Sequence, residues 1–257
     1  MRINVAGKMA IRDRERLLAE RDLPGNQGRL VLAILALERR HPIGRDRLAD
    51  ELWPNQLPKS WETALRAVIS KIRTAATRAG FHPRLIESAF GCYQLRAGDG
   101  EVDVDVASDA LHLAEAFHAK DDFESAGAPA VMTCIIARRP FLPGLYNPWT
   151  LQQRDRLRDL HVSARQILID IHAERGSWEL AARHAQLALE LDPYDERLHR
   201  RLIVARARAG DRLGAAHVFS RYRNLIETEL GVAPSKAITA LLERELGEGS
   251  VDQAGTH

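Results

Sequence analysis

The pattern of apolar and polar positions predicts a small sheet followed by a series of helices. Apolar residues alternate weakly with polar ones over residues 2–22, which predicts a short antiparallel sheet. Residues 25–40 carry a broad apolar face and predict a buried helix. Pro42 and Gly44 separate this helix from a shorter one over residues 45–53. The chain is therefore expected to open with strands that lead into a helical core.

A longer amphipathic helix is predicted to begin at Ser60, a suitable N-cap residue. Its apolar face consists of Trp61, Leu65, Val68, Ile69, Ile72 and Ala76. The opposite stripe consists of Thr63, Arg66, Ser70, Arg73 and Thr77, flanked by Ala67 and Lys71. We expect this stripe to be cationic and free of acids, which suits contact with phosphates and guanine edges. An ordinary solvated helix face is the alternative interpretation, although such faces usually mix both charge signs.

A β-hairpin is predicted over residues 84–95, with its turn near Phe90 and Gly91. A short helix, a loop, a long helix and a hairpin follow each other in the order of a winged helix-turn-helix. This fold usually binds double-stranded DNA. We place this domain at residues 1–98 and an acidic, Gly-containing connector at residues 99–106.

The rest of the chain is predicted to be helical and to form one domain over residues 107–246, with a disordered tail at 247–257. The predicted helices span residues 107–119, 123–138, 149–175, 177–190, 194–209, 212–229 and 234–246. Gly176 and Gly210 lie 34 residues apart, as do Ala181 and Ala215, which is the period of a tetratricopeptide helical hairpin. The predicted fold class is therefore mostly α with a small β component: a winged helix-turn-helix followed by an all-α, tetratricopeptide-like domain.

Composition and charge fit this division. The chain has 257 residues, of which 45% are hydrophobic and 28% are charged, as in globular proteins of two domains. Residues 1–100 hold 18 Lys and Arg against 11 Asp and Glu, whereas residues 101–257 hold 19 against 24. The basic half contains the predicted helix-turn-helix, which favours attraction to phosphates. Ordinary variation in surface charge is the alternative explanation.

Other chemistries find little support in the sequence. Cys92 and Cys134 form no CxxC pair, the ten histidines are dispersed, and no HExxH occurs, so we expect no metal site. Asp103 and Asp105 could act as a carboxylate pair, but their place after the hairpin favours a role at the domain junction or in capping the next helix. No GxSxG motif and no Gly-rich phosphate loop appears. We therefore expect neither an enzyme nor a bound cofactor.

The location of the protein is also an expectation from the sequence. No apolar run approaches the roughly 18 residues of a membrane span, so we expect no membrane contact. The N-terminus has no long apolar segment of a secretory signal. The sequence thus predicts a cytoplasmic protein.

Several motifs together resemble a known family. In the first domain they are RDRLADELWP, ALRAVISKIR and GCYQL, and in the second they are FLPG and the run from Pro193 to Ser235. Over about residues 1–246 these segments resemble the Streptomyces antibiotic regulatory protein (SARP) family of bacterial transcriptional activators. Such proteins join a winged helix of the response-regulator output type to a helical bacterial transcriptional activation domain. Without a phosphate loop or a receiver segment, the chain is expected to be a small stand-alone regulator.

The resemblance implies roles for residues of the long helix and the hairpin. Base edges would face Arg66, Ala67 and Lys71, and phosphates would face Thr63, Ser70 and Arg73. Lys59 would hold the DNA backbone at the entrance of the helix. In the wing, Ser88 keeps a hydroxyl, whereas Phe90 and Cys92 stand where related proteins usually have Arg and Gly, and the turn is one residue shorter. These departures put the usual minor-groove contact in doubt, and Arg84 is the candidate to compensate for it.

The resemblance also implies partners. They are double-stranded promoter DNA bound as direct repeats, a second protomer through self-association on DNA, and RNA polymerase holoenzyme, at the bacterial nucleoid. Two alternatives stay open: a repressor with the same mode of DNA binding, and a protein-interaction scaffold whose winged helix docks on a protein partner.

Overall fold

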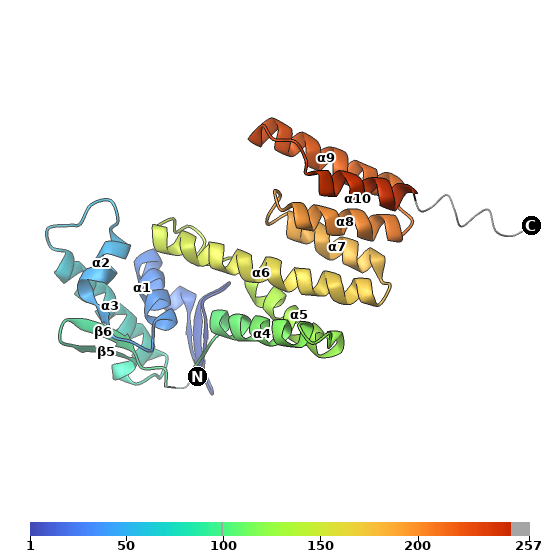
Figure 1. Ribbon diagram of the computed structural model, residues 1–257. Coiled ribbons are helices and arrows are strands. Elements are labelled where there is room, and N and C mark those ends of the chain that lie inside the picture. The colour runs from blue at the N-terminus through green and yellow to red at the C-terminus, as the bar shows by residue number, and fades with distance from the viewer. Residues whose placement is uncertain (99, 248–257) are drawn as a thin grey trace, which may run out of the picture. The chain divides into compact units, whose positions relative to one another are not determined.

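The computed structural model describes residues 1–98 and 100–247, which are mostly helical and include two small sheets (Figure 1). The chain divides into two compact units. The first consists of Met1–Asp109 with Ile135–Asp159, and the second of Ala110–Cys134 with the chain from Leu160. The division falls within α4 (Asp103–His118), α5 (Phe123–Ala137) and α6 (Pro148–Glu174). Among the described residues, no helix is both long and apolar enough to cross a membrane.

The first unit opens with a four-stranded sheet in the order β3-β2-β1-β7. The strands are β1 (Arg2–Asn4), β2 (Ala10–Asp13), β3 (Arg16–Ala19) and β7 (Glu101–Val102), and the helix η1 (Glu20–Asp22) follows β3. β1, β2 and β3 pair antiparallel, and β7 is parallel to β1. Ile3, Ile11 and Leu18 alternate with exposed neighbours and are buried. The antiparallel sheet predicted over residues 2–22 is confirmed.

The helix-turn-helix follows this sheet. It consists of α1 (Gly25–Leu37), α2 (Arg45–Leu52) and α3 (Trp61–Arg78). A second sheet, in the order β4-β6-β5, joins them, with β4 (Ile43–Gly44), β5 (Ile86–Ala89) and β6 (Cys92–Leu95), and the short helix η2 (Pro83–Leu85) leads into β5. α1 is buried from Gly28 to Ala36, because almost every residue there is apolar and α2 and α3 pack against it. This arrangement is a winged helix-turn-helix with α3 as its longest helix.

The segment predicted to be a connector, residues 99–106, is different in the structure. It contains β7 and the first residues of α4, which begins at Asp103. The Asp103 carboxylate is buried and accepts hydrogen bonds from the backbone N–H groups of Val5 at 2.9 Å, Ala6 at 3.2 Å and Val104 at 3.0 Å. Burial raises the pKa of this carboxyl, and the backbone donors oppose that shift. Asp103 therefore joins the first turn of α4 to the chain after β1, within the first unit.

A later segment packs into the first unit as well, although the sequence placed it in the helical domain. Ala6 forms an isolated bridge with Phe141, and the Gly7 N–H donates to Pro140 O at 2.9 Å. The Asn147 side chain donates to Glu51 O at 2.8 Å, at the end of α2. The FLPG motif therefore lies against the N-terminal sheet, which places residues 135–159 with the first unit.

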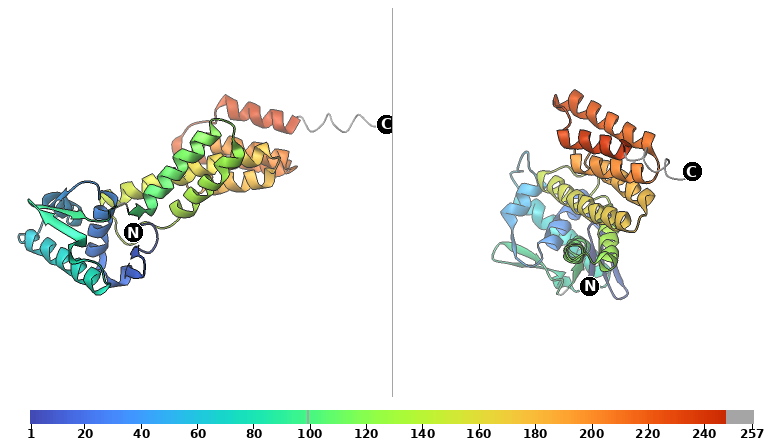
Figure 2. Two further views of the ribbon diagram at one scale, coloured as in Figure 1. Left: turned by 90° about the horizontal axis from the view of Figure 1, so that it is seen from below. Right: turned by 45° about the vertical axis from the view of Figure 1, so that its right-hand side comes forward.

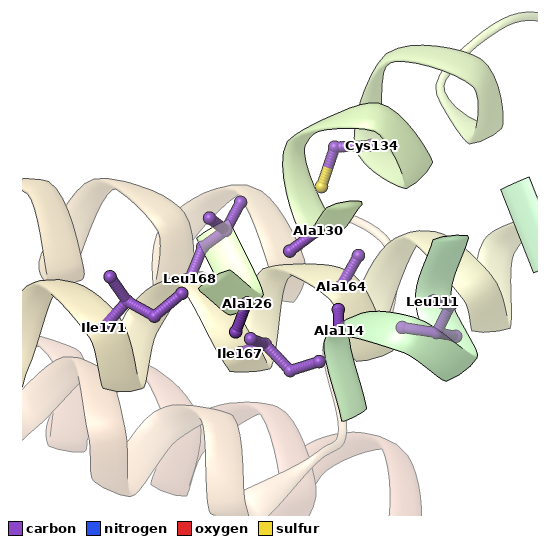
Figure 3. Close-up of a cluster of buried hydrophobic side chains, with 9 residues drawn as sticks. All are labelled: Leu111, Ala114, Ala126, Ala130, Cys134, Ala164, Ile167, Leu168 and Ile171. Atoms are coloured by element: carbon purple, nitrogen blue, oxygen red, sulfur yellow. The ribbon is translucent and has the colours of Figure 1, made fainter. Parts of the chain in front are cut away.

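The second unit begins with a core made by α4, α5 and α6 (Figure 3). Its buried side chains are Leu111, Ala114, Ala126, Ala130, Cys134, Ala164, Ile167, Leu168 and Ile171. Four of them are alanines that are completely buried, and such small side chains let the helix backbones approach closely. Burial raises the pKa of the Cys134 thiol to about 11, so this cysteine is a packing residue.

The remaining helices form two consecutive pairs, which lie side by side in Figures 1 and 2. They are α7 (Trp178–Leu189), α8 (Glu196–Arg208), α9 (Arg212–Leu230) and α10 (Lys236–Gly247). Gly176 and Gly210 precede the first helix of each pair with φ of +67° and +86°, and this left-handed conformation explains glycine at both ends of the 34-residue period. Ala181 and Ala215 are fully buried at equivalent positions. The predicted tetratricopeptide-like fold is confirmed.

The predicted boundaries of the last six helices agree with the structure to within two residues at each end. Gly247, expected to start the tail, is instead the last residue of α10. The rest of the predicted tail, residues 248–257, lies outside the described residues.

Candidate nucleic-acid interface

The long helix α3 has one buried and one exposed face, as its spacing predicted. Leu65, Val68, Ile69 and Ile72 are buried against the core of the first unit. The predicted contact residues Thr63, Arg66, Ala67, Ser70 and Lys71 are all exposed, on the opposite side of the helix. Figure 1 shows α3 beside α2 and the hairpin of β5 and β6. The helix thus presents hydroxyl, methyl and cationic groups together on one free surface.

The prediction that this surface contains no acid is wrong. Glu62 lies one turn before Arg66, and its carboxylate accepts a charged hydrogen bond of 2.8 Å from the Arg66 guanidinium. The same carboxylate lies 3.5 Å from the guanidinium of Arg45 at the start of α2. The Arg66 side chain is 64% exposed, and exposed pairs of this kind contribute at most about 1 kcal/mol. Arg66 can therefore exchange Glu62 for an anionic or guanine partner at small cost.

Arg73, which was predicted to contact a phosphate, makes two hydrogen bonds to strand β5 of the wing. Its Nε donates to Ile86 O at 3.0 Å, and its Nη2 donates to the Ser88 hydroxyl at 3.2 Å. The side chain is only partly exposed. Arg73 and Ser88 are therefore partners of each other, and they tie strand β5 of the wing to α3.

The wing is a tight hairpin. β5 and β6 pair antiparallel with Ala89 opposite Cys92, so only Phe90 and Gly91 form the turn. Both have positive φ, +50° and +76°, as in a type I′ turn. The position of the turn predicted from the sequence is confirmed. Phe90 is fully exposed at the tip, where the related proteins were expected to have an arginine.

Three further predicted contacts are cations around α3. Lys59 is exposed in the loop before the helix, Lys71 in its middle, and Arg84 in η2 before the wing. Over residues 1–98 and 100–247, none of the three side chains has an ion-pair partner. They are therefore available to phosphates without first breaking a salt bridge.

Arg45 is a residue that the sequence did not single out. Its backbone N–H donates to Gly91 O at 3.0 Å, which holds the wing turn to the start of α2. Its guanidinium lies 6.0 Å from the centre of the Trp61 ring, within cation–π range. No local pattern reveals the bond to Gly91, because the two residues lie 46 positions apart. Arg45 adds a cation beside the wing and the first turn of α3.

The described residues offer no group of three or more His, Cys, Asp or Glu side chains that could hold a metal ion. The exposed polar groups predicted to contact DNA gather instead on the surface of α3 and around the wing. Their chemistry is that of noncovalent contact: guanidinium and ammonium groups, several hydroxyls and an exposed methyl.

Comparisons with known proteins agree with this description. The model of the bacterial transcriptional activator domain matches residues 102–246. The regulatory protein AfsR of Streptomyces coelicolor is 27% identical over 221 residues, which cover 86% of this chain and 22% of AfsR. The transcriptional regulatory protein EmbR of Mycobacterium tuberculosis is 27% identical over 245 residues, which cover 87% of this chain and 58% of EmbR. The chain thus spans less than two thirds of either relative.

A solved structure of Mycobacterium tuberculosis EmbR, in complex with a low-affinity phosphopeptide, has the same fold. It superposes with a TM-score of 0.76 over 96% of this chain and 65% of that one, at 23% sequence identity. By name, the two relatives are a regulatory protein and a transcriptional regulatory protein. Since the family model covers more than half of its residues, the chain belongs to the family of bacterial transcriptional activator domain proteins, the SARP-type transcriptional regulators.

Proposed function

We propose that this chain is a sequence-specific activator that places α3 in the major groove of promoter DNA. The exposed stripe of α3, opposite its buried face, carries this proposal. Arg66 and Lys71 would donate to O6 and N7 of guanines, and Ala67 would contact a thymine methyl group. In this proposal residues 1–98 form the DNA-binding domain. Residues 135–159, which come later in the chain, pack against that domain and stabilise it.

The remaining polar groups would contact the DNA backbone or support the wing. Thr63 and Ser70 flank the base-contacting residues on α3, so their hydroxyls would donate to phosphates. Lys59 and Arg84 would add phosphate contacts at either side, because neither is engaged in an ion pair with another described residue. Arg73 and Ser88 would act through the wing, which they fix to α3.

Activation would follow from recruitment. Two protomers would bind direct repeats in tandem, and the helical domain would contact the neighbouring protomer and RNA polymerase holoenzyme. A head-to-tail pair needs no two-fold axis, so the operator would be a repeat rather than a palindrome. The protein would then act in the bacterial cytoplasm, at the nucleoid.

Selection from random duplexes, followed by a salt titration of the enriched sequence, tests the proposal. We expect a short repeated motif whose binding is lost in the double variant R66A/K71A. The matched control is R200A/R223A, which removes two exposed arginines of α8 and α9 and the same charge. Equal loss in both variants would mean that only bulk charge matters.

Failure to enrich any duplex, even at low salt, would refute DNA binding and favour a protein-docking scaffold. The spacing of the repeats tests tandem binding. Transcription with purified polymerase then separates the two regulatory outcomes, since an activator raises and a repressor lowers the amount of transcript from the selected site.

A further inference from the structure

Phe90 is the most exposed large hydrophobic side chain of the described residues. Its relative exposure is 105%, compared with 78% for Leu213, the next most exposed. It stands at the tip of the wing, between Ala89 and the bare Gly91. The wing therefore ends in a single aromatic ring with no neighbouring side chain of similar size in the turn.

The backbone of Phe90 is also unfavourable for a residue of this type. Its φ of +50° lies in the left-handed region, where a type I′ turn strongly prefers Asn, Asp or Gly. A bulky residue is rare in this conformation. An exposed phenyl ring buries no apolar surface that could offset this strain. The positive φ and the exposure of Phe90 thus do not stabilise the first unit. This points to a binding partner outside the chain.

The tip is held firmly despite its exposure. Arg73 binds β5 through Ile86 O and the Ser88 hydroxyl, at 3.0 and 3.2 Å. On the other side, the Arg45 N–H binds Gly91 O at 3.0 Å, and Gly44 of β4 pairs with Cys92 of β6. The hairpin is therefore fixed to α3 and to the start of α2. A ring presented on such a support loses little conformational freedom when it binds.

A cation lies beside the turn that carries the ring, where it also pairs with the Glu62 carboxylate at 3.5 Å. A Cβ atom placed on Gly91 would lie 3.9 Å from the Arg45 Nε, so the guanidinium flanks the turn. An apolar wedge next to an arginine is a combination that minor-groove proteins use. The wedge enters between base pairs while the cation meets the negative potential of the groove. Because only one side chain projects from the two-residue turn, the tip can enter a groove with a single ring.

We infer that Phe90 enters the minor groove beside the site of α3 and wedges into a flexible pyrimidine–purine step, which it partly unstacks. This inference rests on the proposed function. It makes Phe90 a specificity-determining residue that senses the deformability of the DNA rather than its base edges. Steps such as TA or CA unstack easily, whereas A-tracts are stiff, so the affinity depends on the step under the wing.

A cycle of two proteins and two duplexes tests this inference. The first duplex carries a TA step under the wing, located by scanning that step through the sequence flanking the α3 site, and the second carries AA there. The variant F90N removes the ring but keeps the turn, because asparagine accepts positive φ. Wild type should bind the TA duplex about tenfold more tightly than the AA duplex, and F90N should bind both equally.

A second readout follows the base stack directly. With 2-aminopurine in place of the adenine of the TA step, wild type should raise its fluorescence and F90N should not. The variant L213N is the matched control, because it removes an exposed apolar side chain from α9, outside the wing. It should behave like wild type in both measurements.

The outcomes separate this inference from the proposed function. If wild type binds but F90N retains the tenfold preference for TA, the inference is wrong and the proposed function stands. An equal loss of affinity on both duplexes, with the preference unchanged, overturns it too, since Phe90 would then act without unstacking. If wild type binds no duplex at all, the proposed function itself fails.

Discussion

Replacing Arg73 with alanine should destabilise the wing without removing a phosphate contact. The side chain makes two charged hydrogen bonds to β5, through Ile86 O and the Ser88 hydroxyl. Hydrogen bonds to charged groups contribute about 1.5–3 kcal/mol each when buried, and partial exposure reduces this. We expect R73A to lower the free energy of unfolding by about 1–2 kcal/mol. The variant R78A, at the exposed end of the same helix, should change it by less than about 0.5 kcal/mol.

The salt dependence of DNA binding distinguishes support from contact. Each phosphate contact contributes about 0.9 to the slope of log K against log salt. R73A should leave this slope unchanged, although its affinity falls, whereas K59A should lower it by about 0.9. A slope that falls by about 0.9 in R73A, with no loss of stability, would refute the supporting role and restore Arg73 as a phosphate contact.

Three further predictions concern stability. D103A should lower the free energy of unfolding by about 3 kcal/mol, because the buried N–H groups of Val5 and Ala6 lose their acceptor. Urea unfolding measures this change, and a loss below about 1 kcal/mol would contradict the prediction. Burial and the positive Arg165 lower the pKa of His184 to about 4 from 6.5, so its neutral form stabilises the fold above pH 6.5 and this contribution is lost between pH 6.5 and 4. Between pH 6.5 and 4, the free energy of unfolding of the original chain should fall by about 1–2 kcal/mol more than that of H184Q, after allowance for the partial exposure of His184. Equal pH dependence of the free energy of unfolding in both proteins would exclude this role. A215L should lower the free energy of unfolding by about 1–3 kcal/mol, because a larger side chain overpacks the fully buried site between α8 and α9. Calorimetry measures this loss, and a stability equal to that of the original chain would mean that the site has free space.

The spacing of apolar residues and the positions of glycines predicted the helix faces, the hairpin turn and the helix boundaries. The two faces of α3 follow from the helical period, because Leu65, Ile69 and Ile72 recur with it. The turn at Phe90 and Gly91 follows from the break between two short apolar runs. The repeating glycines Gly176 and Gly210 marked the turns before the first helix of each pair, where the backbone has positive φ.

The structure shows contacts that the sequence did not predict where residues distant in sequence meet. Arg73 reaches Ile86 and Ser88 across 13 and 15 positions, and no helical spacing indicates that contact. The start of α4 at Asp103 depends on backbone donors from Val5 and Ala6, at the other end of the unit. The pair of Glu62 and Arg66 is different, because the i,i+4 spacing was visible in the sequence.

The most direct test of DNA recognition by α3 is to repeat the duplex selection with R66A and compare the enriched sequence with that of the original chain. If Arg66 contacts a guanine, the preference at one base pair should relax by about 1–3 kcal/mol while the preferences at the other positions remain. An enriched sequence that is unchanged at every position would show that Arg66 reads no base, and would contradict the placement of α3 in the major groove.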